Sequence, residues 1–486
     1  MRRALTVIHA LGLMLIMFSA AYFMPVIASL IYGDHTMLLD FLLAMMWTAS
    51  AGALMWMLTR HHKGELSIRH GYLLVVAMWT AMPAFATIPL LMMLPGLSFT
   101  DAYFETMSGL TTTGSTVLIG LDNLPPAINI WRHEMEWLGG LGIIVLAVAV
   151  LPLLGIGGRQ LFKAEMPGPV KESTLTPRIA DTARNLWAVY VAITLVCIGA
   201  LKWAGMDWLD AVCHAFSTMG LGGFSTHDAS VGFFNSPLIE IVMIVFMLFA
   251  VINFATHFLA WRGRTPVVYW HDTEAKAAIG LILSSCLGIA IFLWWNGVYP
   301  EFLTALRHAS FNVVSIGASS GFASVDYGQW PIFAPMWILF VGCIAASSGS
   351  TGGGIKMIRT LVLFKQAGRE LLKLLHPSAI NPMKIGGHVI ANNIVFAVLG
   401  FIFLYFMTIV ALTFVMLISG LDFITAFTAV IASINNFGPG LGSVGPASNY
   451  AGLTDFQTWV CTFAMLVGRL EVFTVLILFT PNFWKR

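Results

Sequence analysis

The sequence predicts an all-α polytopic membrane protein. Four repeats of a transmembrane helix, a short pore helix and a second transmembrane helix are expected around a central pore, after two N-terminal transmembrane helices. Three observations lead to this fold class. Of the 486 residues, 58% are hydrophobic and 10% are charged, and with a mean hydropathy of +0.84 this composition excludes a soluble globular protein. Apolar segments recur along the chain, and one glycine-centred pattern occurs four times between them.

Ten apolar segments approach the ~20 residues that a helix needs to cross a bilayer. The first is longer than the apolar core of a secretory signal peptide, so we expect it to be a membrane helix. The eighth is interrupted by glycine and hydroxyl residues. The predicted crossings are 4–32, 41–59, 72–94, 138–154, 186–203, 238–261, 277–295, 332–364, 394–418 and 456–479.

The basic residues predict the orientation of these crossings. All but four of the 25 Lys and Arg lie at the two termini or in the segments 60–70, 158–184, 262–276 and 356–384. By the positive-inside rule these parts, including both termini, are cytoplasmic. The four exceptions are Arg132, Lys202, Arg307 and Arg469.

Acidic residues gather on the opposite side, where they would form a mouth that concentrates cations. The residues expected on or near the outer side are Asp101, Glu105, Asp122, Glu134, Glu136, Asp207, Asp210, Asp228, Glu301, Asp326 and Asp422.

The fourfold pattern consists of an alanine, a small residue six positions later and a glycine six positions after that. Its members are Ala102, Ser108 and Gly114; Ala211, Ser217 and Gly223; Ala309, Ser315 and Gly321; and Ala426, Ala432 and Gly438. Each copy starts in a segment too short to span a bilayer, at about 101–110, 208–219, 302–316 and 423–434. We therefore predict four re-entrant pore helices on the outer side, each followed by an extended filter strand.

A fourfold strand of this kind is suited to holding a dehydrated cation. Carbonyl oxygens that point inward from several segments around one axis can replace the hydration shell of an ion, and glycine permits backbone conformations that a Cβ would forbid. One such segment alone would be interpreted as an ordinary turn, but four in equivalent places favour a cation filter. The carbonyls expected to bind the ion are those of Thr111, Thr112, Gly220, Leu221, Ala318, Ser319, Asn435 and Asn436.

The interruption of the eighth crossing is interpreted as a mobile gate below the filter. Glycine and hydroxyl residues should unwind the helix there. A nucleotide-binding loop is excluded by spacing, because Ile355 precedes Lys356 and Met357 stands where Ser or Thr is required. A flexible kink is the other alternative. The gate residues are Ser347, Ser348, Gly349, Ser350, Thr351, Gly352, Gly353 and Gly354.

Arg469 is predicted to lie inside the last crossing, where a charge is costly and by default functional. We interpret it as a pore-facing electrostatic barrier below the filter. The alternative is a structural ion pair with Glu471, although helix residues two apart do not face each other. The five cysteines are scattered, and no disulfide is expected. No metal-ligand spacing occurs among the histidines, so interfacial or loop positions are expected for His61, His62, His214, His227 and His308.

The pattern divides the chain into five parts. The two N-terminal transmembrane helices occupy 1–68, and the four pore repeats occupy 69–160, 161–265, 266–378 and 379–486, of which the third contains the gating loop.

Taken together, the four divergent repeats with one glycine per filter, the broken eighth helix and the arginine in the tenth resemble the superfamily of bacterial Trk/Ktr and plant HKT potassium transporters. The two additional N-terminal helices are similar to its TrkH branch. The resemblance implies a fold with K⁺-channel-type repeats and K⁺ uptake across the bacterial inner membrane. It also implies gating by the loop and by Arg469. Serine at the first filter glycine accompanies Na⁺ preference in the HKT branch, and this chain has Gly114.

The same resemblance implies a homodimer in the membrane lipid and a cytosolic, nucleotide-binding regulatory subunit of the TrkA type on the basic face. K⁺ would be the transported ion, with no organic cofactor and no nucleic acid bound.

The main alternative function is an alternating-access cation symporter, coupled to H⁺ or Na⁺, with the broken helix as its substrate site. Such folds usually contain two halves, whereas these four units share one orientation. An enzyme is not expected. No nucleophile and base pair occurs in the crossings, and the pair His133-Glu134 lacks the second histidine of a zinc helix.

Overall fold

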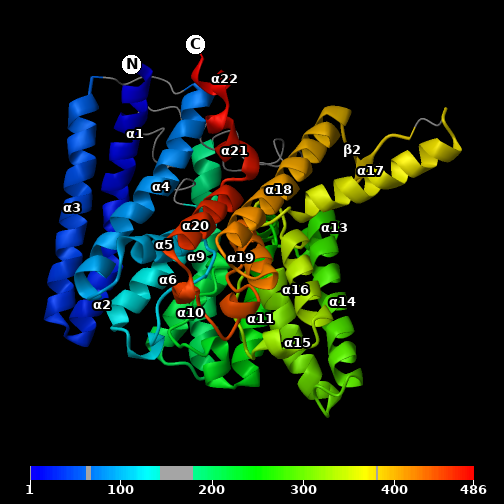
Figure 1. The fold of residues 1–486 in the computed structure, drawn as a ribbon, viewed down its shortest axis with the longest axis horizontal. Coiled ribbons are helices and arrows are strands. Elements are labelled where there is room, and N and C mark those ends of the chain that lie inside the picture. Colours follow the sequence, from blue (N-terminus) through cyan, green and yellow to red (C-terminus); the bar gives the residue numbers. More distant parts are fainter. Residues whose placement is uncertain (1, 62–66, 143–178, 379–380, 486) are drawn as a thin grey trace.

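The computed structural model describes residues 2–61, 67–142, 179–378 and 381–485, and the regular secondary structure of these residues is almost entirely helical (Figure 1). The predicted cytoplasmic segment 158–184 and the boundary between the first two repeats lie largely or wholly outside the described residues. The N-terminal part contains α1 (Arg2–Phe18), η1 (Ser19–Tyr22), α2 (Phe23–Tyr32) and α3 (His35–Thr59).

The order of long helix, short helix, glycine segment and second helix recurs four times. The first repeat contains α4 (Ile68–Met93), α5 (Phe99–Leu110), η2 (Leu121–Asn123) and α6 (Pro126–Leu141). The second contains α9 (Ile179–Trp203), α10 (Trp208–Gly220), η4 (Ser230–Phe234), α11 (Pro237–Val251) and α12 (Phe254–Gly263).

The third repeat contains α13 (Val267–His271), α14 (Thr273–Trp295), α15 (Phe302–Gly317), η5 (Tyr327–Gln329), α16 (Phe333–Ile344) and α17 (Met357–Leu375). The fourth begins with a hairpin of antiparallel β1 (Lys384–Ile385) and β2 (His388–Val389). It continues with α18 (Asn392–Ile418), α19 (Phe423–Asn435), η6 (Gly442–Val444), η7 (Tyr450–Gly452), α20 (Asp455–Arg469), α21 (Val472–Leu476), η8 (Ile477–Phe479) and α22 (Pro481–Trp484).

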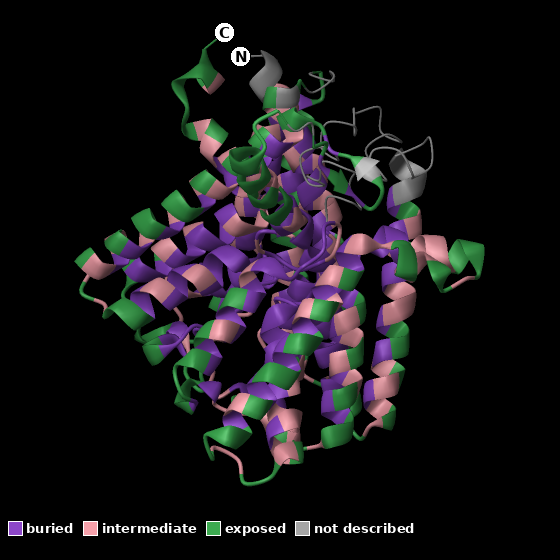
Figure 2. Ribbon diagram, turned by 90° about the vertical axis from the view of Figure 1, so that its right-hand side faces the viewer, coloured by how far each residue is buried: buried purple, intermediate pink, exposed green. Residues whose placement is uncertain are grey.

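Six of the described helices are long and apolar enough to cross a membrane, or up to eight crossings if each of two bent helix pairs forms one span. Both termini lie at the same end of the molecule (Figure 1). Buried residues are concentrated in the middle of the molecule, and exposed residues cover the outlying helices (Figure 2). Many of the exposed side chains are large and apolar, such as Trp47, Leu58, Leu287 and Phe403, as expected where lipid is the solvent.

Two crossings that the sequence predicts to be continuous helices are bent in the structure, so these two predictions are wrong. The sixth bends by 94° between α11 and α12, and the tenth bends by 113° between α20 and the segment from Val472 to Phe479. At the first bend, the side chain of Asn253 caps α12 by accepting the amide of Ala255. At the second bend, Glu471 has a φ of 62°. The fourth crossing also begins earlier than predicted, because α6 starts at Pro126; beyond residue 142 it lies outside the described residues.

The four short helices match the predicted pore helices to within two residues at each end. Three of them begin with a side chain that accepts a backbone amide in the first turn, supplied by Ser98, Asp207 and Asp422. These caps satisfy amides that have no partner inside the helix. The alanine that opens the sequence pattern is completely buried in all four copies, so a larger side chain would not fit there.

Candidate functional site

Each pore helix ends in the same reversal of the chain. The residue two positions before the filter glycine has a left-handed backbone, with φ of 53° at Thr112, 55° at Leu221, 64° at Ser319 and 53° at Asn436. None of the four is glycine, the residue that normally adopts this conformation. Strained backbone of this kind persists only where its surroundings enforce it, and it is concentrated at functional sites.

Two hydrogen bonds hold this reversal in every repeat. The amide of the residue before the glycine donates to the carbonyl of the small residue in the sequence pattern, and the next amide upstream donates to a carbonyl three residues back. The first bond measures 2.8 Å for Thr113 to Ser108, 2.9 Å for Gly222 to Ser217, 2.7 Å for Ser320 to Ser315 and 3.2 Å for Phe437 to Ala432. This is the Schellman motif, and it explains the spacing of six residues that the sequence shows.

The four glycines form a closed ring. A Cβ placed on Gly321 would lie 2.5 Å from the carbonyl oxygen of Phe437, and one on Gly438 would lie 2.9 Å from that of Thr113. The two other glycines are even closer to their neighbours, Gly114 to the carbonyl of Gly222 and Gly223 to that of Ser320. Each glycine therefore faces the next segment in chain order, and the fourth faces the first. All four have positive φ, from 78° to 97°.

The backbone carbonyls around this ring are available to a ligand. No described backbone amide donates to the carbonyls of the three residues that precede each glycine. Eight of these carbonyls are the predicted ligands, at the second and third positions before the glycine. A further carbonyl, that of the residue immediately before each glycine, is not among the predicted ligands. This carbonyl faces the neighbouring segment at Thr113, Gly222, Ser320 and Phe437. The geometry of the turn, rather than residue type, identifies it.

A polar side chain of each pore helix supports the strand beyond the glycine. In the first repeat Glu105 accepts the amide of Val117 at 3.0 Å, and in the third Asn312 accepts the amide of Ser324 at 3.2 Å. His214 contacts the hydroxyl of Ser225 at 3.0 Å in the second repeat. In the fourth, Thr428 accepts the amide of Leu441 at 2.8 Å.

Two of these supports correct the sequence interpretation. His214 is completely buried, so its expected interfacial position is wrong, whereas His227 does lie in a loop. Glu105, Glu134 and Glu136 are also buried, with exposures of 1%, 3% and 0%, and so they do not line an acidic outer mouth. The predicted crossings and their orientation placed these chain positions near the outer side, but the side chains turn into the protein.

Glu105 forms a buried ion pair with Arg132 of α6. The Arg132 guanidinium lies 2.8 Å from the carboxylate, and both side chains are 1% exposed. It also donates to the carbonyl of Ser225 at 3.3 Å and lies 4.3 Å from the centre of the Phe224 ring. The pair thus connects the supports of the first and second filter segments. Removing either partner would leave an uncompensated buried charge.

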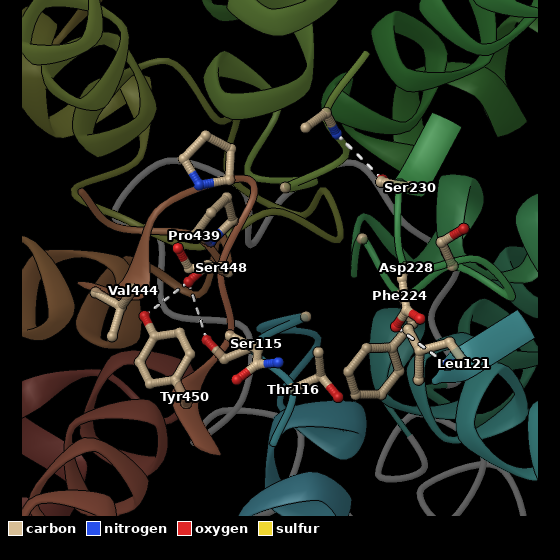
Figure 3. Close-up of a pocket in the computed structure, with 18 of the residues that line it drawn as sticks. Ser115, Thr116, Leu121, Phe224, Asp228, Ser230, Pro439, Val444, Ser448 and Tyr450 are labelled. Carbon is tan, nitrogen blue, oxygen red and sulfur yellow. Dashed lines mark hydrogen bonds between the residues drawn. The ribbon is translucent and has the colours of Figure 1, made fainter. Parts of the chain in front are cut away.

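A pocket opens above the glycine ring and is lined by all four filter glycines (Figure 3). Its wall includes Ser115 and Tyr450, whose hydroxyls both donate to the Gly438 carbonyl at 2.9 Å. The charged side chains in its lining are Arg132 and Asp228, together with the titratable His227. We call this pocket the vestibule.

His227 connects two filter loops at the edge of this vestibule. Its Nδ1 lies 2.5 Å from Asp122 in the first repeat, and its Nε2 lies 3.3 Å from Asp210. Burial opposes protonation, but the hydrogen bonds to the two carboxylates outweigh it and raise the pKa of His227 above its usual value. Groups of three or more His, Cys, Asp or Glu suited to a metal ion are absent from the described ranges.

The predicted gate loop lies between α16 and α17, directly below the filter. The hydroxyl of Thr351 donates to the carbonyl of Met219 at the end of α10, at 3.1 Å. A Cβ on Gly352 would lie 3.1 Å from the carbonyl of Ala318, and Gly353 packs against the carbonyl of Asn435. Ala318 and Asn435 are two of the predicted ligands. The loop therefore contacts the ends of three pore helices at the inner side of the filter.

Arg469 connects this loop to the first repeat. Its guanidinium donates to the carbonyl of Thr351 at 2.8 Å and to the hydroxyl of Thr112 at 3.3 Å. It also donates to the carbonyls of Gly139 and Gly140 in α6, the latter at 2.9 Å. The alternative pairing with Glu471 is not what the structure contains, because Glu471 pairs with Arg359 at 2.6 Å.

A second cationic side chain, that of Lys356, lies beside the loop. The sequence predicts Lys356 to be at the start of a cytoplasmic segment. The Lys356 ammonium donates to the carbonyl of Gly352 at 2.6 Å. The buried carboxylate of Glu274 in α14 accepts the amides of Ser348 at 2.6 Å and Ile358 at 3.1 Å. The two ends of the interruption are thus fixed to one side chain, a contact between distant segments that no local pattern reveals.

The chain is similar to known proteins over nearly its whole length. A family model described as TrkH, cation transport protein, matches residues 38–486. The chain is 44% identical over 487 residues to the Trk system potassium uptake protein TrkH of Salmonella typhimurium, with 99% of both chains covered. It is 36% identical to the Trk system potassium uptake protein TrkG of Escherichia coli, covering 99% of this chain and 98% of the relative. The crystal structure of the potassium transporter TrkH from Vibrio parahaemolyticus superimposes with a TM-score of 0.89 at 41% identity, covering 99% of each chain.

Proposed function

The chain belongs to the TrkH family of cation transport proteins, and from this premise we propose that it takes up K⁺ across the bacterial inner membrane through a channel-like filter. The observation that carries the proposal is the closed ring in which each positive-φ glycine faces a carbonyl of the next segment. A ring of backbone oxygens around one axis is the arrangement that replaces the water shell of a permeating cation. Relatives described as potassium uptake proteins support K⁺ as the cargo.

In this mechanism K⁺ sheds water in the vestibule and is held by the carbonyls of the four filter segments. The predicted set is Thr111, Thr112, Gly220, Leu221, Ala318, Ser319, Asn435 and Asn436, to which we add the carbonyls immediately before the glycines. Below the filter, the loop from Ser347 to Gly354 closes the path. The guanidinium of Arg469 adds an electrostatic barrier, because a fixed positive charge repels a cation in a low-dielectric surrounding.

The proposed assembly is a homodimer with both termini in the cytoplasm and a cytosolic nucleotide-binding subunit of the TrkA type on the basic face. The common description of the relatives as parts of a Trk system supports a partner. Helix α17 offers a surface for such contacts, because it exposes Phe364, Leu371, Leu374 and Leu375 on a helix that also carries Lys365 and Arg369.

Uptake of radiolabelled Rb⁺ into proteoliposomes loaded with KCl tests the proposal, with external K⁺, Na⁺ and Li⁺ as competitors. A gated potassium pore predicts inhibition by K⁺ far more than by Na⁺ and faster uptake by Arg469→Ala. An alternating-access symporter predicts that uptake depends on an H⁺ or Na⁺ gradient and falls in the same variant. The proposed pore would be refuted if uptake were the same in Arg469→Ala as in the wild type and were not inhibited by any of the competing ions.

A further inference from the structure

The second filter segment is held by a carboxylate from a different repeat. Glu136 lies in α6 of the first repeat and is fully buried. Its carboxylate accepts the amide of Phe224, immediately after the filter glycine, at 3.0 and 3.3 Å to its two oxygens. The same carboxylate accepts the hydroxyl of Ser217. It also fills the space in which a Cβ of Gly222 would lie, which explains the glycine at this position.

Ser217 extends this support to the filter glycine itself. Its hydroxyl accepts the amide of Gly223 at 2.9 Å while it donates to Glu136. The equivalent hydroxyls of Ser108 and Ser315 make no hydrogen bond among the described residues, and the fourth repeat has Ala432 at this position. The serine that the sequence pattern repeats three times is therefore engaged with the filter glycine in the second repeat and not in its described equivalents.

We propose that Glu136 and Ser217 are positioning residues that set the discrimination between K⁺ and Na⁺ by fixing the second filter segment from behind. The inference rests on the proposed function, because it names residues that tune the same filter. Neither side chain touches the ion path; they act through the amides of Gly223 and Phe224. Those two amides belong to the segment whose Leu221 has a left-handed backbone and whose Gly222 carbonyl faces Gly114.

The physical reason is the rigidity that a selective cage requires. In the cavity-size account of ion selectivity, a carbonyl cage favours the larger ion because its oxygens resist closing around the smaller one. Two amides without acceptors in a buried site would each lose a hydrogen bond, and the strained segment would relax toward ordinary backbone conformations. Its carbonyls would then approach Na⁺ more closely, so selectivity should fall before K⁺ flux is lost.

Serine variants provide the first test, because alanine occurs naturally at the equivalent position of the fourth repeat. Ser217→Ala removes the acceptor of the Gly223 amide, and Ser315→Ala removes an equivalent hydroxyl that has no partner in the part of the chain that the structure describes. Competition of K⁺ and Na⁺ against radiolabelled Rb⁺ uptake gives a ratio of inhibition constants for each protein. We expect the K⁺ over Na⁺ ratio to fall roughly fivefold in Ser217→Ala, the change produced by a typical neutral hydrogen bond, and to stay at the wild-type value in Ser315→Ala.

The second test uses two glutamates of the same helix. Glu136→Ala should lower the ratio by about tenfold or more, because it removes the acceptor of both the Phe224 amide and the Ser217 hydroxyl. Glu136→Gln retains an acceptor for the Phe224 amide and should restore most of the selectivity. Glu134→Ala is the control, since Glu134 is 3% exposed but its Oε2 has no hydrogen-bond partner within the described residues. Thermal unfolding of each purified variant shows that a change in ratio is not a loss of fold.

Equal ratios in Ser217→Ala and Ser315→Ala, in a protein whose wild type prefers K⁺, would overturn the inference and leave the proposed function intact. So would a Glu136→Gln variant as unselective as Glu136→Ala. Failure of the proposed function itself appears in the wild-type arm, as uptake that K⁺ does not inhibit more than Na⁺.

Discussion

The filter glycines are required by two independent features at each position. At Gly114 the backbone has a φ of 78°, where a side chain is strained, and the space for a Cβ is occupied by the carbonyl of Gly222. The neighbouring carbonyl cannot move without disturbing its own segment, because Gly222 is held by Ser217 and Glu136. A substitution at one glycine therefore distorts two filter segments.

Gly114→Ala is expected to abolish K⁺-selective uptake. The methyl group would collide with the Gly222 carbonyl, and the positive φ would add of order 1–3 kcal/mol of strain. Radiolabelled Rb⁺ uptake measures the loss. Gly120→Ala is the matched control, since Gly120 also has a positive φ of 75° but has nothing within 4 Å of its Cβ position. If Gly114→Ala kept the wild-type ratio of K⁺ to Na⁺, the assignment of this segment to the filter would be wrong.

His227 predicts a pH dependence of stability at the vestibule. Burial lowers its tendency to protonate, but hydrogen bonds to Asp210 and Asp122 raise its pKa above 6.5, the ordinary value. A group whose pKa is raised on folding contributes stability that is complete below its unfolded pKa and is lost as pH rises through the folded value. The contribution should therefore be full at acidic pH and disappear toward alkaline pH.

Thermal unfolding of the purified protein across neutral pH tests this dependence. We expect the wild type to lose stability relative to His227→Gln as the pH rises through the raised pKa of His227. His271→Gln is a suitable control, because the imidazole of His271 bonds a backbone carbonyl on an exposed helix. A difference between wild type and His227→Gln that is constant with pH would show that folding does not raise the pKa of His227.

At the scale of elements, the second helix of each repeat ends close below the filter. α6 ends at Leu141, α11 at Val251, α16 at Ile344 and α20 at Arg469. Among the three breaks that are described on both sides, the one after α16 is the longest, and its loop contacts the ends of three pore helices. Buried, irregular backbone at this depth is tolerated only where protein or a water-filled path surrounds it. The loop meets this condition by bonding to Met219, Arg469 and Glu274.

Deletion of Ser350 to Gly353 should leave the pore constitutively open. The deletion removes the carbonyls of Thr351 and Gly352, which accept hydrogen bonds from Arg469 and Lys356. Both cationic side chains thereby lose their contact with the gate loop. Rb⁺ uptake should rise several-fold and become insensitive to the state of a regulatory partner. Replacement of the same four residues by glycine controls for chain length. Closed, wild-type flux in the deletion variant would indicate that the segment is only a kink.

At the scale of the whole molecule, the N-terminal helices join the first repeat. The ring of Tyr22 stacks on that of Trp131 in α6 with centroids 4.4 Å apart, and the Trp131 indole donates to the carbonyl of Ala86 in α4 at 3.1 Å. Gly12 and Gly52 allow α1 and α3 to approach backbone to backbone, a common device where lipid removes the hydrophobic force between helices. The fourfold ring thus sits in an asymmetric molecule.

The charge distribution predicts how this molecule sits in the membrane. Ala229, beside the vestibule, should face the periplasm, and Gly368 in α17 should face the cytoplasm. Both are exposed, so Ala229→Cys and Gly368→Cys can be labelled with an impermeant maleimide. We expect Ala229→Cys to be labelled in cells in which only the outer membrane has been permeabilised. Gly368→Cys should be labelled only when the inner membrane has been opened too. The reverse pattern would contradict the proposed orientation.

Patterns within single segments of the sequence were enough to predict the membrane class, most of the crossing segments, the ends of the four short helices to within two residues, and the positions of the four glycines that form the ring. These features are local: hydropathy depends on composition within one segment, and the glycine pattern reports a turn that each segment forms with its own helix. The resemblance to the Trk family, which rests on the same motifs, is confirmed by the comparisons.

The contacts that each segment makes could not be predicted and are seen only in the folded protein. The ring joins residues roughly a hundred positions apart, such as Gly114 and Gly222. Glu136 and Glu105 look like outer acidic residues in the sequence, yet they are buried supports of the filter. The sequence likewise does not predict the bend at Asn253 or the pairing of Glu471 with Arg359. Burial and long-range hydrogen bonding are set by which elements meet, and no local pattern of residues contains that information.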